Sequence, residues 1–131
     1  METAQTIAAL ALIVIGGLAV DRAQAQQGIK RTDLQRHDLS APGRETIQTR
    51  VDFAPGAAFP RHTHPGEEII YVIEGSIEYE VDGKPVTVKA GGVLFIPAGT
   101  VHAAKNVGTT NAAELGTYVV EKGKPLVTLA E

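Results

Sequence analysis

Residues 56–75 read GAAFPRHTHPGEEIIYVIEG, and residues 91–106 read GGVLFIPAGTVHAAKN. The two stretches hold three of the four histidines of the 131-residue chain. Glycine and proline divide both stretches into short runs of apolar and β-branched residues, which is typical of strands joined by tight turns. Both the fold and the chemistry that the sequence predicts depend on these two stretches.

The histidines of the first stretch have the spacing of a metal site. Successive side chains on a strand point to opposite faces, so His62 and His64 share one face. Glu68 keeps the same parity if the strand resumes after the intervening proline and glycine. His102 comes from the second stretch and reaches the others only if the sheet folds over. The spacing therefore predicts one metal site built from two distant segments.

The donor types indicate which metals would fit. Three neutral imidazole nitrogens and one carboxylate oxygen suit a borderline divalent transition metal and leave room for water or substrate. A closed structural zinc site would more often use thiolates, and this chain has no cysteine. The set accepts manganese, iron, cobalt, nickel, copper or zinc, so the sequence predicts one divalent metal ion without identifying it.

The same two stretches resemble, position for position, the two motifs of the cupin superfamily, in the same order and with a short spacer between them. The resemblance implies a small single-domain, all-β protein: a cupin-like double-stranded β-helix, or jelly-roll barrel, that holds one metal ion. The ligands that it implies are His62, His64, Glu68 and His102. It also implies that the glycines and Pro97 are turn residues and that Asn106 is a structural polar residue.

Residues outside the motifs also favour strands. Residues 46–53 alternate between apolar and polar, as a half-buried antiparallel strand does. Asp82-Gly83 is a strong hairpin signal, and Glu74-Gly75 is expected to form a second two-residue turn. No convincing helix follows residue 25, and many short strands at close intervals indicate a sandwich or barrel.

The turn at Glu74-Gly75 would fix a register in which Ile70 pairs with Tyr79. With Glu68 pointing inward, this register and strand parity predict the lining of the cavity beside the metal. The predicted lining residues are Ile47, Thr49, Val51, Phe53, Ile70, Tyr79 and Ala104. This lining is apolar, has few hydroxyl groups and contains no lysine or arginine.

The N-terminal part resembles an export signal. The apolar and glycine run from Ile7 to Val20 is too short for a comfortable membrane span, and Ala23-Gln24-Ala25 supplies a cleavage pattern. No basic residue precedes the run, which departs from the usual signal, and an uncleaved anchor helix is the alternative. The expected segments are a signal peptide (1–25), a loosely held polar arm (26–45) and a cupin β-barrel domain (46–131).

The expected location is periplasmic or secreted, with no membrane contact after cleavage. The formal charge is −3 and the chain has no basic run, which argues against a nucleic-acid partner. His37, in the polar arm, is expected to be a solvated loop residue. Small single-domain cupins resemble one another in pairing through outer sheet faces, so the resemblance implies a homodimer with Tyr71 as a candidate contact.

The leading functional hypothesis is an exported metal-dependent enzyme with dioxygenase-like oxidative chemistry on a small apolar or aromatic substrate. Glu68 is expected to release the metal and act as a general base, and Tyr79 to orient the substrate through its hydroxyl. Two alternatives stay open, because a fold does not fix a function. One is a metal-dependent isomerase or lyase acting on a sugar or small acid. The other is a non-enzymatic module that binds a metal or small ligand.

Overall fold

The computed structural model describes residues 27–131, and the expected signal segment 1–25 lies outside them. The described part of the chain is built from β-strands, with no helix. Residues 27–131 accordingly offer no helix with the length and apolar character that crossing a membrane requires. In chain order the strands are β1 (Ile29–Asp38), β2 (Arg44–Phe53), β3 (Ala58–Thr63), β4 (Gly66–Glu74), β5 (Ser76–Val81), β6 (Lys84–Lys89), β7 (Val93–Ile96), β8 (His102–Asn106), β9 (Ala112–Glu121) and β10 (Thr128–Leu129).

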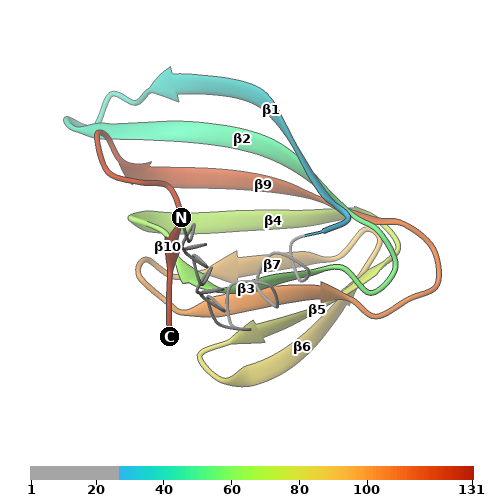
Figure 1. The fold of residues 1–131 in the computed structure, drawn as a ribbon. Coiled ribbons are helices and arrows are strands. Elements are labelled where there is room, and N and C mark those ends of the chain that lie inside the picture. Colours follow the sequence, from blue (N-terminus) through green and yellow to red (C-terminus); the bar gives the residue numbers. More distant parts are fainter. Residues whose placement is uncertain (1–26) are drawn as a thin grey trace, which may run out of the picture.

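The strands form two antiparallel sheets that face each other (Figure 1). The first sheet has the order β1-β2-β9-β4-β7, and the second has the order β10-β3-β8-β5-β6. Strands that follow one another in the chain often lie in different sheets, as β3 and β4 do. This arrangement confirms the expected all-β jelly-roll fold.

Two strands of the first sheet, β2 and β9, direct alternate side chains into the interior. On β2, Val51 and Phe53 point inward and are buried, as the sequence pattern predicts. On β9, Tyr118 and Val120 point inward in the same way. Each apolar side chain of this size that leaves water stabilises the fold by roughly 1.5–3 kcal/mol. The core therefore lies between the sheets, around the residues that line the site.

The segment expected to be a loose arm is largely a strand. All of β1 lies within residues 26–45, and its pairing with β2 runs from Ile29 opposite Phe53 to Asp38 opposite Glu45. The strand forms an exposed edge of the first sheet, which explains its polar composition. His37 is exposed, as expected, but it lies on this strand and not in a loop.

The turn expected at Glu74-Gly75 does not form a hairpin. β4 belongs to the first sheet and β5 to the second, so Ile70 pairs with Leu94 and Gly116 instead of Tyr79. Gly75 has a φ of 73°, and a Cβ there would lie 2.7 Å from a backbone oxygen. Only glycine permits this close crossing between the sheets.

Tyr79 nevertheless points inward. It pairs with Val86 and Ala104 in the second sheet and is only 1% exposed. The predicted inward direction is therefore correct, although the pairing from which it was predicted is wrong.

Candidate metal centre

The two sheets bring four residues together, which we call the His/Glu cluster. Its members are His62 on β3, His64 just after β3, Glu68 on β4 and His102 on β8. One ligand atom from each lies within 4.8 Å of the others, and all four side chains are buried. His62 and His102 sit opposite each other on neighbouring strands of the second sheet, and Glu68 comes from the first. The sequence stretches predicted to converge do converge.

Backbone carbonyls orient all three imidazole rings of the cluster. The Nδ1 atoms bond to the carbonyl oxygens of Pro60 for His62 (2.7 Å), Leu126 for His64 (2.6 Å) and Thr100 for His102 (2.9 Å). A carbonyl only accepts, so each Nδ1 carries the hydrogen and donates it. A neutral ring in this state presents a bare lone pair at Nε2, which is the form that ligates a metal.

The donor set fits a divalent metal ion. The Nε2 atoms of His64 and His102 each lie 3.1 Å from Oε2 of Glu68. If the rings are neutral, lone pairs face a carboxylate oxygen at this distance and repel it. A cation held between them removes the repulsion, and the set leaves a position open for a further ligand. The cluster can therefore hold one metal ion.

The protonation states of His62 and Glu68 in the folded protein also favour metal binding. Burial and the neighbouring His102 lower the pKa of His62 to about 4. Burial acts to raise the pKa of Glu68, but the adjacent His102 and His64 rings, when they also carry a proton at Nε2, outweigh burial and lower it to about 2. At neutral pH His62 is neutral and Glu68 is ionised, as metal binding requires.

A small space adjoins the cluster, which we call the inner cavity. Its volume is about 20 Å³, enough for one or two groups the size of water. The predicted lining residues that do line it are Val51, Phe53, Ile70, Tyr79 and Ala104. Ile47 lies at a different pocket, and Thr49 is buried beside the cavity without lining it.

The prediction that no lysine or arginine lines the cavity is wrong. Arg31 lies on the exposed edge strand β1, and its guanidinium reaches the inner cavity. One of its nitrogens donates to the hydroxyl of Tyr118 at 3.4 Å. Partial desolvation acts to lower the pKa of Arg31, but Tyr118 and the acids Glu68 and Glu114 raise it above its ordinary value. The cavity thus contains a permanent positive charge.

Three further residues of the cavity wall were missed: Phe59 on β3, and Glu114 and Tyr118 on β9. Glu114 is buried and accepts a hydrogen bond from the hydroxyl of Tyr79. Burial and the negative charge of Glu68 raise the pKa of Glu114 to about 8. The ring of Tyr118 stands edge-on to that of His64, with centroids 4.7 Å apart. The alternating pattern of β9 was the available signal for Glu114 and Tyr118, because it gives both residues the inward parity.

Gly116, between Glu114 and Tyr118 on β9, keeps this region open. A Cβ at Gly116 would lie 3.0 Å from Oε1 of Glu68 and 3.3 Å from the Tyr118 hydroxyl. Any larger side chain would press on both groups. The small size of this residue is therefore part of the site.

This chain resembles known proteins in both its sequence and its fold. The family model described as the cupin domain matches residues 49–128. Germin-like protein subfamily 2 member 2 of Arabidopsis thaliana is 37% identical over 86 residues, which cover 59% of this chain and 39% of that protein. The oxalate-binding protein of Thermotoga maritima is 35% identical over 72 residues, covering 54% of this chain and 60% of that protein.

A solved structure of oxalate oxidase in complex with the substrate analogue glycolate has a TM-score of 0.63 and 29% identity, covering 79% of this chain and 55% of that chain. The chain thus spans about two fifths of the germin-like relative's length. The family model covers more than half of the chain, and the residues that it matches include all four members of the His/Glu cluster. The chain belongs to the cupin family.

Proposed function

We propose that this cupin binds one divalent metal ion through the His/Glu cluster and oxidises a small carboxylic acid in the inner cavity. The observation that carries the proposal is the guanidinium of Arg31 in the same cavity as the cluster. A cation beside a metal site is what an anionic substrate requires, and it replaces the apolar pocket expected from the sequence.

The size of the cavity supports a very small substrate. A volume of about 20 Å³ does not admit an aromatic ring without rearrangement of the wall. A two-carbon acid can place one carboxylate oxygen in this space and leave the rest of the molecule near Arg31. We therefore prefer a small acid to the aromatic substrate of the leading hypothesis.

Arg31 also has donors available for a carboxylate. Its hydrogen bond to the Tyr118 hydroxyl, at 3.4 Å, is long and uses one of five N–H groups. Guanidinium and carboxylate can form two parallel hydrogen bonds, which fixes the orientation of the acid. Two relatives agree in their names: one binds oxalate, and the other oxidises oxalate and was solved with glycolate.

The proposed reaction is the oxidation of a two-carbon diacid by dioxygen. One oxalic acid and one dioxygen give two molecules of carbon dioxide and one of hydrogen peroxide. The carbon–carbon bond breaks, and its electron pair passes to dioxygen with the two acid protons. The metal ion would supply the redox-active binding site for the reactants. Arg31 holds and orients the acid, and the apolar wall around Ile70 and Phe53 excludes water.

The test uses protein loaded with Mn²⁺, Fe²⁺ or Cu²⁺ and supplied with oxalate or glycolate. We expect metal-dependent oxygen consumption and hydrogen peroxide with at least one of the acids. Arg31→Met should raise KM by about tenfold or more, because it removes a charged partner of the substrate. Its metal content should stay unchanged, because Arg31 is not a ligand.

A second candidate, a non-enzymatic binder of small acids, is favoured by the name of the Thermotoga maritima relative. Calorimetry of the metal-loaded protein with oxalate separates the two. Oxalate binding without oxygen consumption would support the binder. Absence of both binding and oxygen consumption would exclude both functions.

We also propose that residues 1–25 direct export to the periplasm or the medium, as their sequence pattern indicates.

A further inference from the structure

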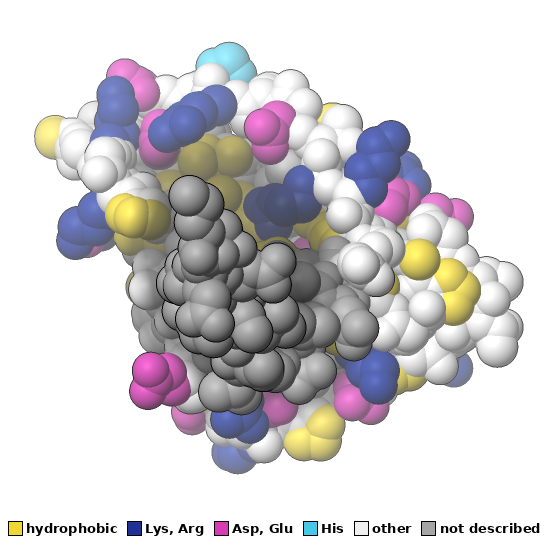
Figure 2. All heavy atoms as spheres, viewed as in Figure 1, with side chains coloured by type: hydrophobic (Ala, Val, Ile, Leu, Met, Phe, Trp, Pro, Cys, Tyr) yellow, Lys and Arg dark blue, Asp and Glu magenta, His cyan; other side chains and the backbone are white. Residues whose placement is uncertain are grey.

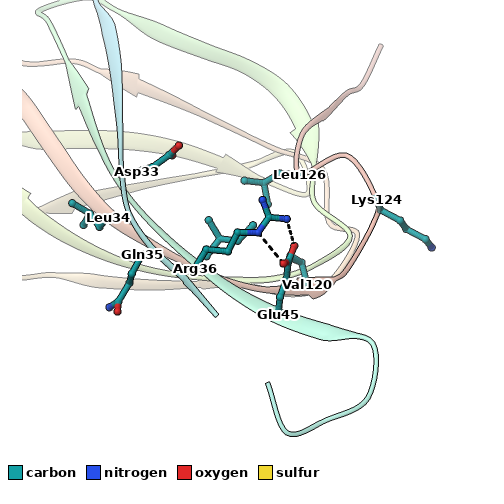
Figure 3. A pocket seen from close by; sticks show the side chains of 9 residues that line it. Asp33, Leu34, Gln35, Arg36, Glu45, Val120, Lys124 and Leu126 are labelled. Carbon is teal, nitrogen blue, oxygen red and sulfur yellow. Dashed lines mark hydrogen bonds and ion pairs between the residues drawn. The ribbon is translucent and has the colours of Figure 1, made fainter. Parts of the chain in front are cut away.

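A larger pocket of about 370 Å³, the outer pocket, lies next to the inner cavity and has no part in the proposed function. Its base is apolar and consists of Ile47, Val120 and Leu126, while Leu34, which is 50% exposed, lies at its rim. Figure 2 shows hydrophobic side chains recessed in a hollow, with charged side chains around it. Figure 3 shows the ion pair between Arg36 and Glu45 at the pocket, with Val120 and Leu126 beside it.

The outer pocket continues the inner cavity along the interior face of the first sheet. Three strands each contribute at least one residue to both spaces, and each strand holds a pair of such residues with the same parity. With the inner residue first, these pairs are Arg31 and Asp33 on β1, Val51 and Ile47 on β2, and Tyr118 and Val120 on β9. The pairs on β1 and β9 are two residues apart, which corresponds to roughly 7 Å, and on β2 only Thr49 lies between Ile47 and Val51 on the inward face, so the spaces are adjacent.

Side chains separate the two spaces. Arg31 and Tyr118 touch across the boundary, with the guanidinium nitrogen 3.4 Å from the hydroxyl. Arg31 is exposed on an edge strand, and exposed side chains change rotamer within picoseconds to nanoseconds. The boundary can therefore open without any change in the backbone.

Thr49 marks the same boundary. It lies between Ile47 and Val51 on the inward face of β2 and is 1% exposed. Among residues 27–131, its Oγ1 is the buried side-chain polar atom that lacks a hydrogen-bond partner. An unsatisfied buried hydroxyl destabilises the fold, and a polar molecule passing or held beside it would satisfy it.

A second hollow of about 300 Å³ also adjoins the inner cavity, on the opposite wall. It meets the cavity at Phe59 and Ala104, which are paired across β3 and β8 of the second sheet. Passage there would require the strands to part and break backbone hydrogen bonds. Passage from the outer pocket requires only side-chain rotation, so the outer pocket is the more accessible route to the inner cavity.

We infer that the outer pocket is the entrance through which metal ions and small anions reach the His/Glu cluster, with the Arg31 side chain as its movable barrier. Arg36 and Glu45 at the rim are bonded to each other, Nε to Oε2 at 2.8 Å, so their charges cancel. Because the two charges cancel, this pair repels neither cations nor anions at the rim. The inference rests on the metal site of the proposed function and does not depend on the substrate.

The test measures the uptake of Co²⁺ by the full chain, with stopped-flow absorption for the rate and equilibrium titration for the affinity. Ile47→Trp fills the outer pocket and should slow uptake and chelator-driven release by about tenfold or more, because access becomes limiting. The equilibrium affinity should not change, because both rates fall together. Ala103→Trp fills the second hollow and is the matched control, with uptake at the wild-type rate.

Leu34→Trp, on the exposed rim, gives a second block that does not disturb the core, and thermal melting reports folding of each variant. Slow uptake in the two outer-pocket variants alone would support the inference. Wild-type rates in both, or slow uptake in Ala103→Trp alone, would overturn it while leaving the metal site intact. Failure of the wild-type protein to bind Co²⁺ would overturn the proposed function and this inference together.

Discussion

Tyr79 on β5 donates a hydrogen bond to Glu114 on β9, so a buried polar contact joins the two sheets at the wall of the inner cavity. Both residues are nearly inaccessible, at 1% and 5% exposed. The raised pKa of Glu114, about 8, means that its carboxyl is mostly protonated at neutral pH. The contact therefore joins two uncharged groups at neutral pH, and it is burial and the nearby Glu68 that make the ionised form of Glu114 unfavourable.

Glu114→Gln should reduce the pH dependence of stability on the alkaline side. A group with a raised folded-state pKa stabilises the fold below its ordinary pKa, near 4.5, and loses that contribution as pH rises through about 8. The contribution of Glu114 to the stability of the metal-free protein should therefore fall between about pH 4.5 and 8, so the melting temperature of the wild type minus that of the glutamine variant should decrease over this range. Calorimetric melting at a series of pH values measures this. Parallel curves for the two proteins would contradict the raised pKa.

Tyr79→Phe should lower turnover of the proposed acid substrate and leave metal content unchanged, because it removes a hydroxyl and no ligand. Glu68→Gln should lower activity further, because it weakens a ligand and removes a candidate base. Elemental analysis and oxygen consumption, measured on the same samples, separate the two effects. Loss of metal in Tyr79→Phe would show that its role is structural.

Replacing both His62 and His64 with alanine should abolish stoichiometric metal binding, because only Glu68 and His102 would remain in the cluster. His37→Ala is the matched control, since His37 is exposed and far along the chain from the cluster. Elemental analysis after gel filtration measures the metal per chain. A double variant that keeps one tightly bound metal would place the site elsewhere.

The contribution of His62 to the stability of the metal-free protein should be lost in mild acid. The folded-state pKa of His62, about 4, lies below the ordinary value of 6.5, so its contribution is complete above 6.5 and is lost as pH falls toward 4. A shift of this size corresponds to a loss on the order of 3 kcal/mol. Denaturant unfolding at pH 7 and pH 4 tests it, and His62→Phe should show a smaller difference between the two.

Protein expressed from the full sequence in a bacterial host should be recovered outside the cytoplasm with Gln26 as its first residue. The apolar run and the Ala23-Gln24-Ala25 pattern are the reason. Intact mass spectrometry of the exported fraction measures the start. A cytoplasmic product that retains Met1 would contradict the signal-peptide interpretation.

The sequence was most informative where a local rule fixes the geometry. Asp82 and Gly83 form the predicted hairpin turn between β5 and β6, with φ values of 50° and 76° and Val81 opposite Lys84. The i, i+2 spacing of two histidines likewise places them on one side of the chain. Such features depend on a few neighbouring residues, and no distant contact has to be known.

The sequence was less informative where the outcome depends on which sheet a strand joins. Gly75 is as compatible with a hairpin as with a crossing between sheets, and only the packing against Ala112 distinguishes them. Arg31 was missed for the same reason: its strand is polar, and pairing with β2 is what carries its guanidinium to the cavity. The sheet to which each strand belongs, and the residues that reach the cavity, therefore depended on long-range strand pairing that local sequence patterns do not specify.

The carbonyl of Leu126 holds the ring of His64, and two residues later β10 pairs with β3 beside Thr63. Occupancy of the metal site is thus linked to the integrity of the C-terminal tail. An affinity tag or fusion partner placed after Glu131, or a protease cut near Leu126, would change metal loading without touching a ligand. The exposed turn at Asp82-Gly83 is the safer insertion point for engineering this protein.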